Sequence, residues 1–239
     1  MKRYLILALA VILAVGCREN LPTGTCQDDI ALPANAESAD SLLMSISLEY
    51  ACGGSAGEAV NQALLYRAFD FEDWAGTVEE AATAYRENLI DEYLTENSGA
   101  QTVSWEDRIN GVFTAPYKGW NNYLLTYYSS KGGAHGIQTV SPIVFDRKSG
   151  AIVSEEDLFA DVWTAPVTEL IRSAVTASMQ GDDDELLDLV EMEMVVPNNN
   201  FSVGPDGVQW IFQPYEVGPY ALGIVSATVS WKQLKPYLK

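Results

Sequence analysis

Residues 42–50 read Leu-Leu-Met-Ser-Ile-Ser-Leu-Glu-Tyr, and this stretch decides the class of fold. Apolar side chains stand at every second position, with Ser45, Ser47 and Glu49 between them. Successive side chains of a strand point to opposite faces, so this alternation predicts a strand with one buried face. Gly53-Gly54 is expected to end the segment.

The clearest predicted helix lies downstream and supplies a layer that can cover this face. Thr77 and Glu80 have the spacing of a capping box, in which each side chain binds the other residue's backbone N–H. Apolar residues then recur at intervals of three and four as far as Asn97. We expect the apolar side of this helix to pack on a sheet.

The remaining strands and helices come in mixed order, with hairpins in place of repeated strand–helix–strand units. Helices are expected after Pro166 and from Asp182. The further predicted strands cover 102–110, 111–115, 120–128, 137–145, 151–153, 201–203, 208–212 and 223–231. This order favours an α+β fold with antiparallel sheets, helices packed on one face and two closely associated subdomains.

The N-terminus has the features of an exported protein. A basic lead at Lys2 and Arg3 precedes an apolar run that is too short to span a bilayer, and Gly16-Cys17 closes it. Residues 13–17 resemble the lipobox of bacterial lipoproteins, in which the signal is cleaved before a cysteine that is then lipidated. The resemblance implies a lipid anchor on Cys17 and a location in the bacterial cell envelope, at the outer membrane or the cell surface.

Four parts of the chain are predicted from these features. They are a lipoprotein signal peptide (1–16), a lipidated cysteine and tether (17–38), an N-terminal α+β domain (39–125) and a C-terminal domain (126–239).

The chain is strongly acidic, with 14 Lys and Arg residues against 33 Asp and Glu residues. Without Lys2 and Arg3 of the leader, 12 basic residues remain and the net charge is −21. Such a chain repels nucleic acid and attracts basic proteins. Solubility alone is the simpler explanation of the same charge.

If Cys17 carries lipid, Cys26 and Cys52 remain as a pair in an oxidising compartment. A disulfide between them would close a loop of about 25 residues and contribute about 3 kcal/mol by the chain-entropy estimate. We therefore predict this disulfide, with two free buried thiols as the alternative. No CxxC or histidine spacing accompanies the pair, which argues against a metal site.

His135 is the single histidine of the chain. It leaves too few ligands for a zinc site of histidine and cysteine, and no GxSxG elbow accompanies it for a serine triad. Its place in the glycine-rich loop 129–136 suits either a structural role or ligand binding. Carboxylates are too abundant for any one pair to indicate a glycosidase, and the acidic run 182–185 fits a helix start better than a calcium loop. No catalytic residue, metal or cofactor is therefore predicted.

Several short motifs in the C-terminal half occur in the order and approximate spacing of a known family. They are Gly132-Gly133-Ala134-His135, Phe145-Asp146 with Ser149-Gly150, Asp157-Leu158-Phe159 and the segment 214–223. Together they resemble the RsiV-like domain, which forms the outer part of the anti-sigma-V factor of Gram-positive bacteria. The same domain accompanies a peptidoglycan deacetylase, outside its catalytic domain. The resemblance covers about residues 120–239, and residues 40–120 look like the partner domain that usually precedes it.

The resemblance implies an extracytoplasmic binding module, because the related domain recognises lysozyme, a strongly basic enzyme. The expected contact region combines the loop 132–136 with the segment 214–220, where prolines and aromatic rings lose little entropy on binding. The alternative is that the prolines only shape a buried turn. The candidate partner-binding residues are His135, Pro214, Tyr215, Pro219 and Tyr220.

The expected function is a non-catalytic envelope lipoprotein that binds a basic protein, such as lysozyme, or a cell-wall component, such as peptidoglycan. The lipid on Cys17 would attach it to the membrane. Two other functions stay open at this point: a cell-wall hydrolase or deacetylase that uses carboxylates, and a structural subunit of a surface complex.

Overall fold

The computed structural model describes residues 21–35, 39–99, 101–180 and 184–239. The predicted signal peptide and Cys17 lie outside these residues. Within the described ranges, no helix combines the length and the apolar character that a membrane span requires.

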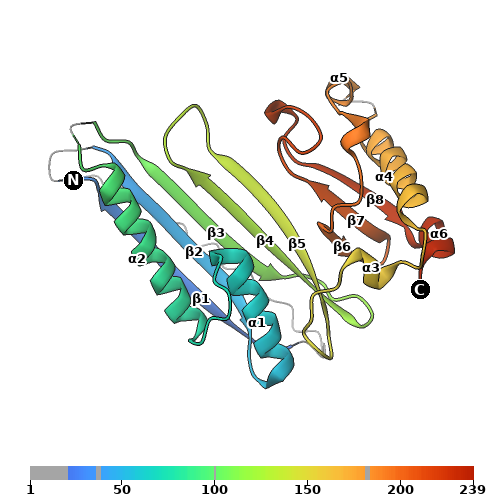
Figure 1. Cartoon of the computed structure of the whole chain (residues 1–239), viewed down its shortest axis with the longest axis horizontal. Helices are drawn as coiled ribbons and strands as arrows, with labels where there is room; N and C mark the ends of the chain where they lie inside the picture. The colour runs from blue at the N-terminus through green and yellow to red at the C-terminus, as the bar shows by residue number, and fades with distance from the viewer. Residues whose placement is uncertain (1–20, 36–38, 100, 181–183) are drawn as a thin grey trace.

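A five-stranded sheet organises the first part of the chain, in the order β1-β2-β3-β4-β5 (Figure 1). All neighbouring strands are antiparallel except β2 and β3. These two are parallel because the chain passes through two helices between them and returns to the end of the sheet at which β2 begins. The sheet is therefore mixed, not purely antiparallel as expected. Its strands are β1 (Thr23–Pro33), β2 (Ser41–Ala51), β3 (Trp105–Phe113), β4 (Trp120–Ser130) and β5 (Ile137–Asp146).

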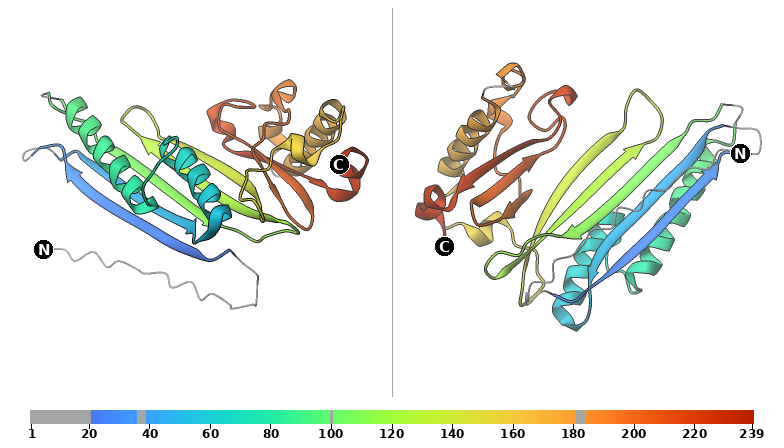
Figure 2. Two further views of the ribbon diagram at one scale, coloured as in Figure 1. Left: turned by 60° about the horizontal axis from the view of Figure 1, so that its bottom comes forward. Right: turned by 180° about the vertical axis from the view of Figure 1, so that it is seen from behind.

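Two helices, α1 (Gly54–Phe69) and α2 (Val78–Glu96), pack on one face of this sheet, over β1 and β2. The expected capping box opens α2: the Thr77 hydroxyl accepts from the Glu80 backbone N–H, and the Glu80 carboxylate accepts from the Thr77 N–H. In the described chain, the opposite face of the sheet has no covering helix (Figure 2). The alternating residues of β2 that face the helices are buried, which confirms the strand with one buried face.

The second part of the chain builds a three-stranded antiparallel sheet with its own core. Helix α4 packs against β8, and large side chains such as Trp210 and Phe212 fill the space between. The elements are α3 (Glu155–Leu158), α4 (Thr164–Met179), α5 (Asp184–Leu187), β6 (Phe201–Val203), β7 (Gly207–Phe212), β8 (Val225–Ser230) and α6 (Trp231–Leu234), with single 3-10 turns at Met192–Met194, Tyr220–Leu222 and Lys235–Tyr237. Two sheets with two hydrophobic cores confirm the α+β class and fit the two associated subdomains.

The expected tether contains a strand, which corrects the sequence prediction. β1 pairs with β2 over its whole length, from Thr23 opposite Ala51 to Pro33 opposite Ser41. An edge strand buries few side chains, so apolar alternation is weak in this segment, and backbone hydrogen bonds to β2 hold it instead. The domain boundary expected between residues 125 and 126 falls inside β4, and the first sheet ends only with β5.

The predicted disulfide is absent, because Cys26 and Cys52 are free thiols in the structure. Cys26 lies opposite Leu48, four residues before Cys52 on the neighbouring strand. At about 3.3 Å per residue along a strand, the two Cα atoms are about 13 Å apart or more, whereas a disulfide joins Cα atoms less than about 7 Å apart. Burial, with the nearby carboxylates of Glu79 and Asp28, raises the pKa of Cys26 to about 11, so this thiol stays protonated and unreactive.

Candidate functional site

Two segments that are far apart in the sequence meet at the junction of the two sheets. One is the loop 131–136 between β4 and β5, and the other is the connection between β7 and β8. The ring of His135 stacks on that of Tyr220, with centroids 3.8 Å apart and planes at 17°. The ring centroid of Tyr215 lies 5.5 Å from that of Tyr220. We call these three residues, His135, Tyr215 and Tyr220, the aromatic stack.

Hydrogen bonds fix the position of the aromatic stack. The Tyr220 hydroxyl donates to the Gly136 carbonyl oxygen over 2.9 Å, which ties the β7–β8 connection to the β4–β5 loop. The backbone of Tyr215 is left-handed, with φ of 70°, and its side chain is 59% exposed. The turn is closed by Glu216, whose carboxylate accepts from the Gln213 N–H and from the Asn198 amide, each over 2.7 Å. A ligand would therefore meet rings that are already positioned.

The two candidate prolines shape the backbone around these rings. Pro214 is half-buried and precedes Tyr215, and Pro219 is exposed and caps the 3-10 turn that begins at Tyr220. The structure thus brings three of the five predicted contact residues into one cluster and places the two prolines beside them in the chain.

An acidic part of the chain packs against this cluster. The Glu191 N–H donates to the Val217 carbonyl oxygen over 2.9 Å, and a Cβ added to Gly218 would lie 2.6 Å from the carbonyl oxygen of Leu189. The segment around residues 189–191 therefore packs directly on the β7–β8 connection. Residues 173–231 contain no Lys or Arg but nine Asp or Glu residues, so a negative potential extends over this part of the molecule. The total charge of the chain does not reveal this local excess, whereas the distribution of charges along the sequence does.

Side-chain amides join the two subdomains at the outer edge of β5. The Gln213 amide donates to the Val140 carbonyl oxygen over 2.6 Å and accepts from the Val140 N–H over 2.9 Å, as a neighbouring strand would. In the same way Asn122 on β4 donates to the Val203 carbonyl oxygen over 2.8 Å and accepts from its N–H over 3.1 Å. The Gln213 pair fixes the β7–β8 connection relative to the first sheet, and the Asn122 pair fixes β6 relative to it.

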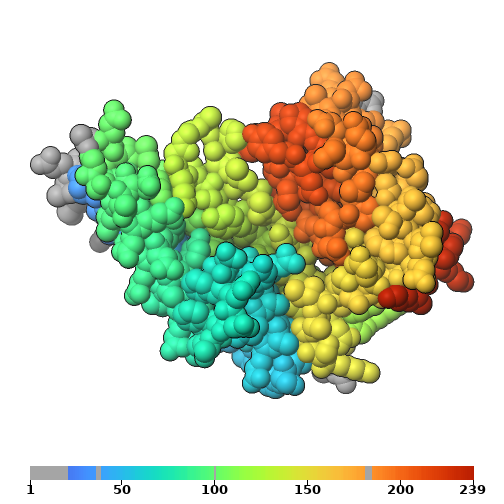
Figure 3. All heavy atoms as spheres, viewed as in Figure 1, coloured from blue at the N-terminus to red at the C-terminus, as the bar shows by residue number. Residues whose placement is uncertain are grey.

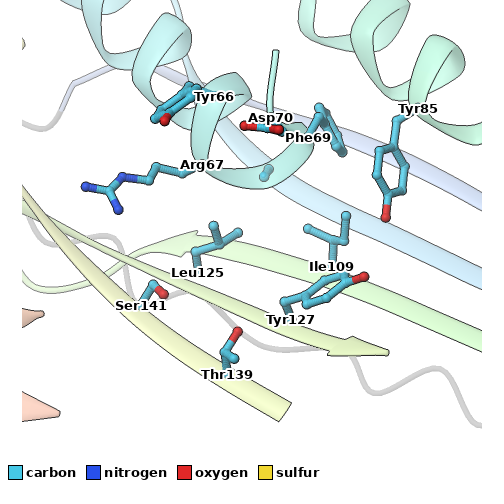
Figure 4. Close-up of a pocket in the computed structure, with 11 residues that line it drawn as sticks. Tyr66, Arg67, Phe69, Asp70, Tyr85, Ile109, Leu125, Tyr127, Thr139 and Ser141 are labelled. Atoms are coloured by element: carbon cyan, nitrogen blue, oxygen red, sulfur yellow. The ribbon is translucent and has the colours of Figure 1, made fainter. Parts of the chain in front are cut away.

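A hollow separates the two helices of the first subdomain from the second subdomain, with the β4–β5 hairpin at its floor (Figure 3). Within this region a cavity of about 410 Å³ opens between the C-terminal end of α1 and strands β3 to β5 (Figure 4). Its lining residues are Tyr66, Arg67, Ala68, Phe69, Asp70, Tyr85, Ile109, Leu125, Tyr127, Thr139 and Ser141.

A buried carboxyl group lies behind this cavity. Asp107 is 1% exposed and accepts from the hydroxyls of Tyr85, over 3.0 Å, and Tyr127, over 2.7 Å. Burial raises the pKa of Asp107 above its usual range and also raises the pKa of both tyrosines. This network was not predicted from the sequence, although Asp107 occupies an inward-facing position of a strand, where a charged residue is unusual.

A second buried carboxyl group, that of Glu155, supports the fold of the C-terminal subdomain. It accepts from the Trp210 indole N–H over 2.7 Å and from the Asn199 N–H over 3.0 Å, and so ties α3 to β7. Burial raises its pKa as well. Across the part of the chain that the structure describes, no cluster of three or more His, Cys, Asp or Glu side chains could hold a metal ion.

Comparisons with known proteins identify a domain and a fold. A family model described as a protein of unknown function (DUF3298) matches residues 156–232. A crystal structure of a member of this family from Bacteroides fragilis NCTC 9343 superposes with a TM-score of 0.81 at 20% identity, over 92% of this chain and 94% of that chain. A family protein from Pseudomonas aeruginosa PAO1 gives a TM-score of 0.68 at 15% identity, over 94% and 97%.

No curated protein matches the chain. The residues that the family model matches include Tyr215 and Tyr220, whereas His135 precedes the matched range. Since a shared fold does not specify a shared function, the RsiV-like resemblance and the lipid anchor stay predictions.

Proposed function

We propose that this protein is a non-catalytic binding module of the bacterial cell envelope that binds a strongly basic protein of the lysozyme kind through the aromatic stack. The observation that supports this proposal best is the convergence of His135, Tyr215 and Tyr220 at one exposed place next to an acidic surface. These residues come from two loops that the sequence resemblance singled out independently of their position in space.

The chemistry of this surface suits a basic protein partner. Tyrosine buries a large area while losing little side-chain entropy, which is why it is frequent among the residues that dominate binding energy. An exposed tyrosine ring also attracts Lys and Arg through its negative face. The acidic chain around the stack would raise the association rate of a basic partner at low salt.

Lipidation of Cys17 would keep such a module at the membrane, where a secreted basic protein arrives from outside. The mass of the intact protein isolated from its native host tests this part of the proposal. Diacylglycerol and a further acyl chain on Cys17 are the expected additions, and an unmodified thiol would contradict it.

Binding of a lysozyme to the mature protein, measured by biolayer interferometry at low and at high salt, tests the function. We expect binding at low salt that weakens as salt rises, and a loss of about tenfold or more in affinity for Tyr215→Ala, as for a central interface residue. Leu94→Ala is the matched control, because Leu94 is also an exposed apolar residue but lies on α2. Absence of binding at low salt, or equal affinity in both variants, would refute the proposal.

A further inference from the structure

We propose that the cavity at the C-terminal end of α1 is a separate binding site for a sugar that carries a carboxylate group. The site is distinct from the aromatic stack, since the residues that line it include none of His135, Tyr215 and Tyr220. Its volume of about 410 Å³ is within the range of small-molecule sites in proteins.

The cation of this site is Arg67. It lies in the last turn of α1, its side chain is exposed, and Figure 4 shows it extending from the helix over β4 and β5. Its guanidinium forms no ion pair or hydrogen bond with any other described residue. Among the arginines of the described residues, Arg86, Arg108 and Arg172 pair with carboxylates. Arg67 does not, and its planar fork suits a ligand carboxylate.

Hydroxyl groups line the floor opposite Arg67. On β5 the residues that face the helices change from Ile143, which is buried, to Ser141 and Thr139, which line the cavity. Neither hydroxyl has a hydrogen-bond partner among the described residues, so both are available as donors and acceptors. These two groups lie about 7 Å apart along the strand, so they can bind different hydroxyls of one sugar ring, which a single polar group could not do.

Aromatic and apolar side chains form the rest of the lining and are held in place from behind. Tyr85 and Tyr127 both donate their hydroxyl hydrogens to Asp107, which fixes their rings in the cavity wall. Leu125 and Phe69 supply apolar surface for the ring carbons of a ligand. Such support from a buried partner is what keeps a binding site in one geometry.

A carboxylate-bearing sugar satisfies all of these groups at once. A purely apolar acid would use Arg67 but leave Thr139, Ser141 and the carboxylate of Asp70 without partners. A neutral sugar would use the hydroxyls and leave the guanidinium unpaired. The combination of one cation, one carboxylate, free hydroxyls and rings therefore points to a sugar acid.

Two probes that share one ring separate the parts of this proposal. N-acetylmuramic acid and N-acetylglucosamine have the same amino-sugar ring, but only the first carries a carboxylate. Each is titrated into the mature protein while the amide signals are followed by ¹H–¹⁵N NMR. We expect shifts centred on Thr139 and Ser141, and affinity for N-acetylmuramic acid about tenfold higher than for N-acetylglucosamine, as a charge-assisted pair contributes.

The variant Arg67→Gln should remove this preference and leave both probes with the same weak affinity. Arg108→Gln is the matched control, since it makes the same change of charge on a β3 residue that lies outside the cavity lining. Equal affinity for the two probes in the native protein, shifts that map elsewhere, or an unchanged preference in Arg67→Gln would each overturn the proposal. Lysozyme binding by Arg67→Gln and sugar binding by Tyr215→Ala should both persist, so failure of either proposal is distinguishable from failure of the other.

Discussion

Replacing Gln213 by alanine should loosen the junction between the two subdomains without unfolding either of them. The Gln213 side chain is the partner of both the N–H and the carbonyl oxygen of Val140 at the edge of β5. Alanine can make neither hydrogen bond, whereas the cores on the two sides of the junction do not include this side chain.

The expected magnitude follows from what each backbone group loses. The Val140 carbonyl oxygen keeps a second donor, the Asn200 amide at 3.1 Å, so removal of the Gln213 donor costs this oxygen little free energy. The Val140 N–H loses its partner in a half-buried position, which costs about 1–2 kcal/mol when water reaches it incompletely. Because 1.4 kcal/mol is about a factor of ten, hydrogen exchange of the Val140 amide should become about tenfold faster.

Hydrogen exchange followed by NMR is the suitable assay, because a chain with two cores need not unfold in a single step. Amides in the centres of β2 and β7 report on the two subdomains and should keep their protection. Gln209→Ala is the matched control, since Gln209 is exposed on β7. An unchanged Val140 exchange rate in Gln213→Ala, or equal acceleration at all sites, would show that the amide pair does not hold the junction.

Three further substitutions test the interior, each by urea denaturation. Burial raises the pKa of Asp107 in the native protein, so its ionisation weakens the fold as pH rises from the ordinary value of 3.8 through the raised native value. Over this pH range the free energy of unfolding of Asp107→Asn should therefore increase relative to that of the native protein. A difference that stays constant with pH would contradict the assignment. Gly150→Ala should cost about 2 kcal/mol or more, because φ is 75° and the new Cβ would lie 2.0 Å from the Ala56 carbonyl oxygen; native-like stability would show that this contact relaxes freely. Trp210→Phe should cost about 2–3 kcal/mol, since it removes both buried volume and the donor to Glu155, and a loss below about 1 kcal/mol would mean that another donor replaces the indole.

Local sequence signals predicted the elements whose causes are local. The alternation in 42–50 and the capping box at Thr77 each act within a few residues, and the structure has β2 and α2 at those places. Helix α1 was not predicted, because Gly53, Gly54 and Gly57 at its start are typical of a turn. Its apolar positions, which include Val60 and Leu64, do follow helical spacing.

Long-range strand pairing and loop contacts could not be predicted from local sequence patterns. β1 is a strand because β2 offers it a free edge, and a free cysteine at position 26 follows from the register of that pairing. Likewise, the stack of His135 on Tyr220 depends on two loops whose hydrogen-bonded residues, Gly136 and Tyr220, are 84 positions apart, and only the motif resemblance pointed to both loops. The cavity was missed since its hydroxyls and its arginine come from separate elements.

The parallel pairing of β2 with β3 limits the order in which this protein can fold. Leu42 and Trp105 are partners although 63 residues separate them, whereas β3, β4 and β5 follow one another through short connections. Closing the long loop loses more chain entropy, so the local meander forms early and the docking of β2 with both helices is the slow step. Until that step, the apolar side of β2 and the edge of β3 are open to other chains. Refolding should therefore give the highest yield at low protein concentration.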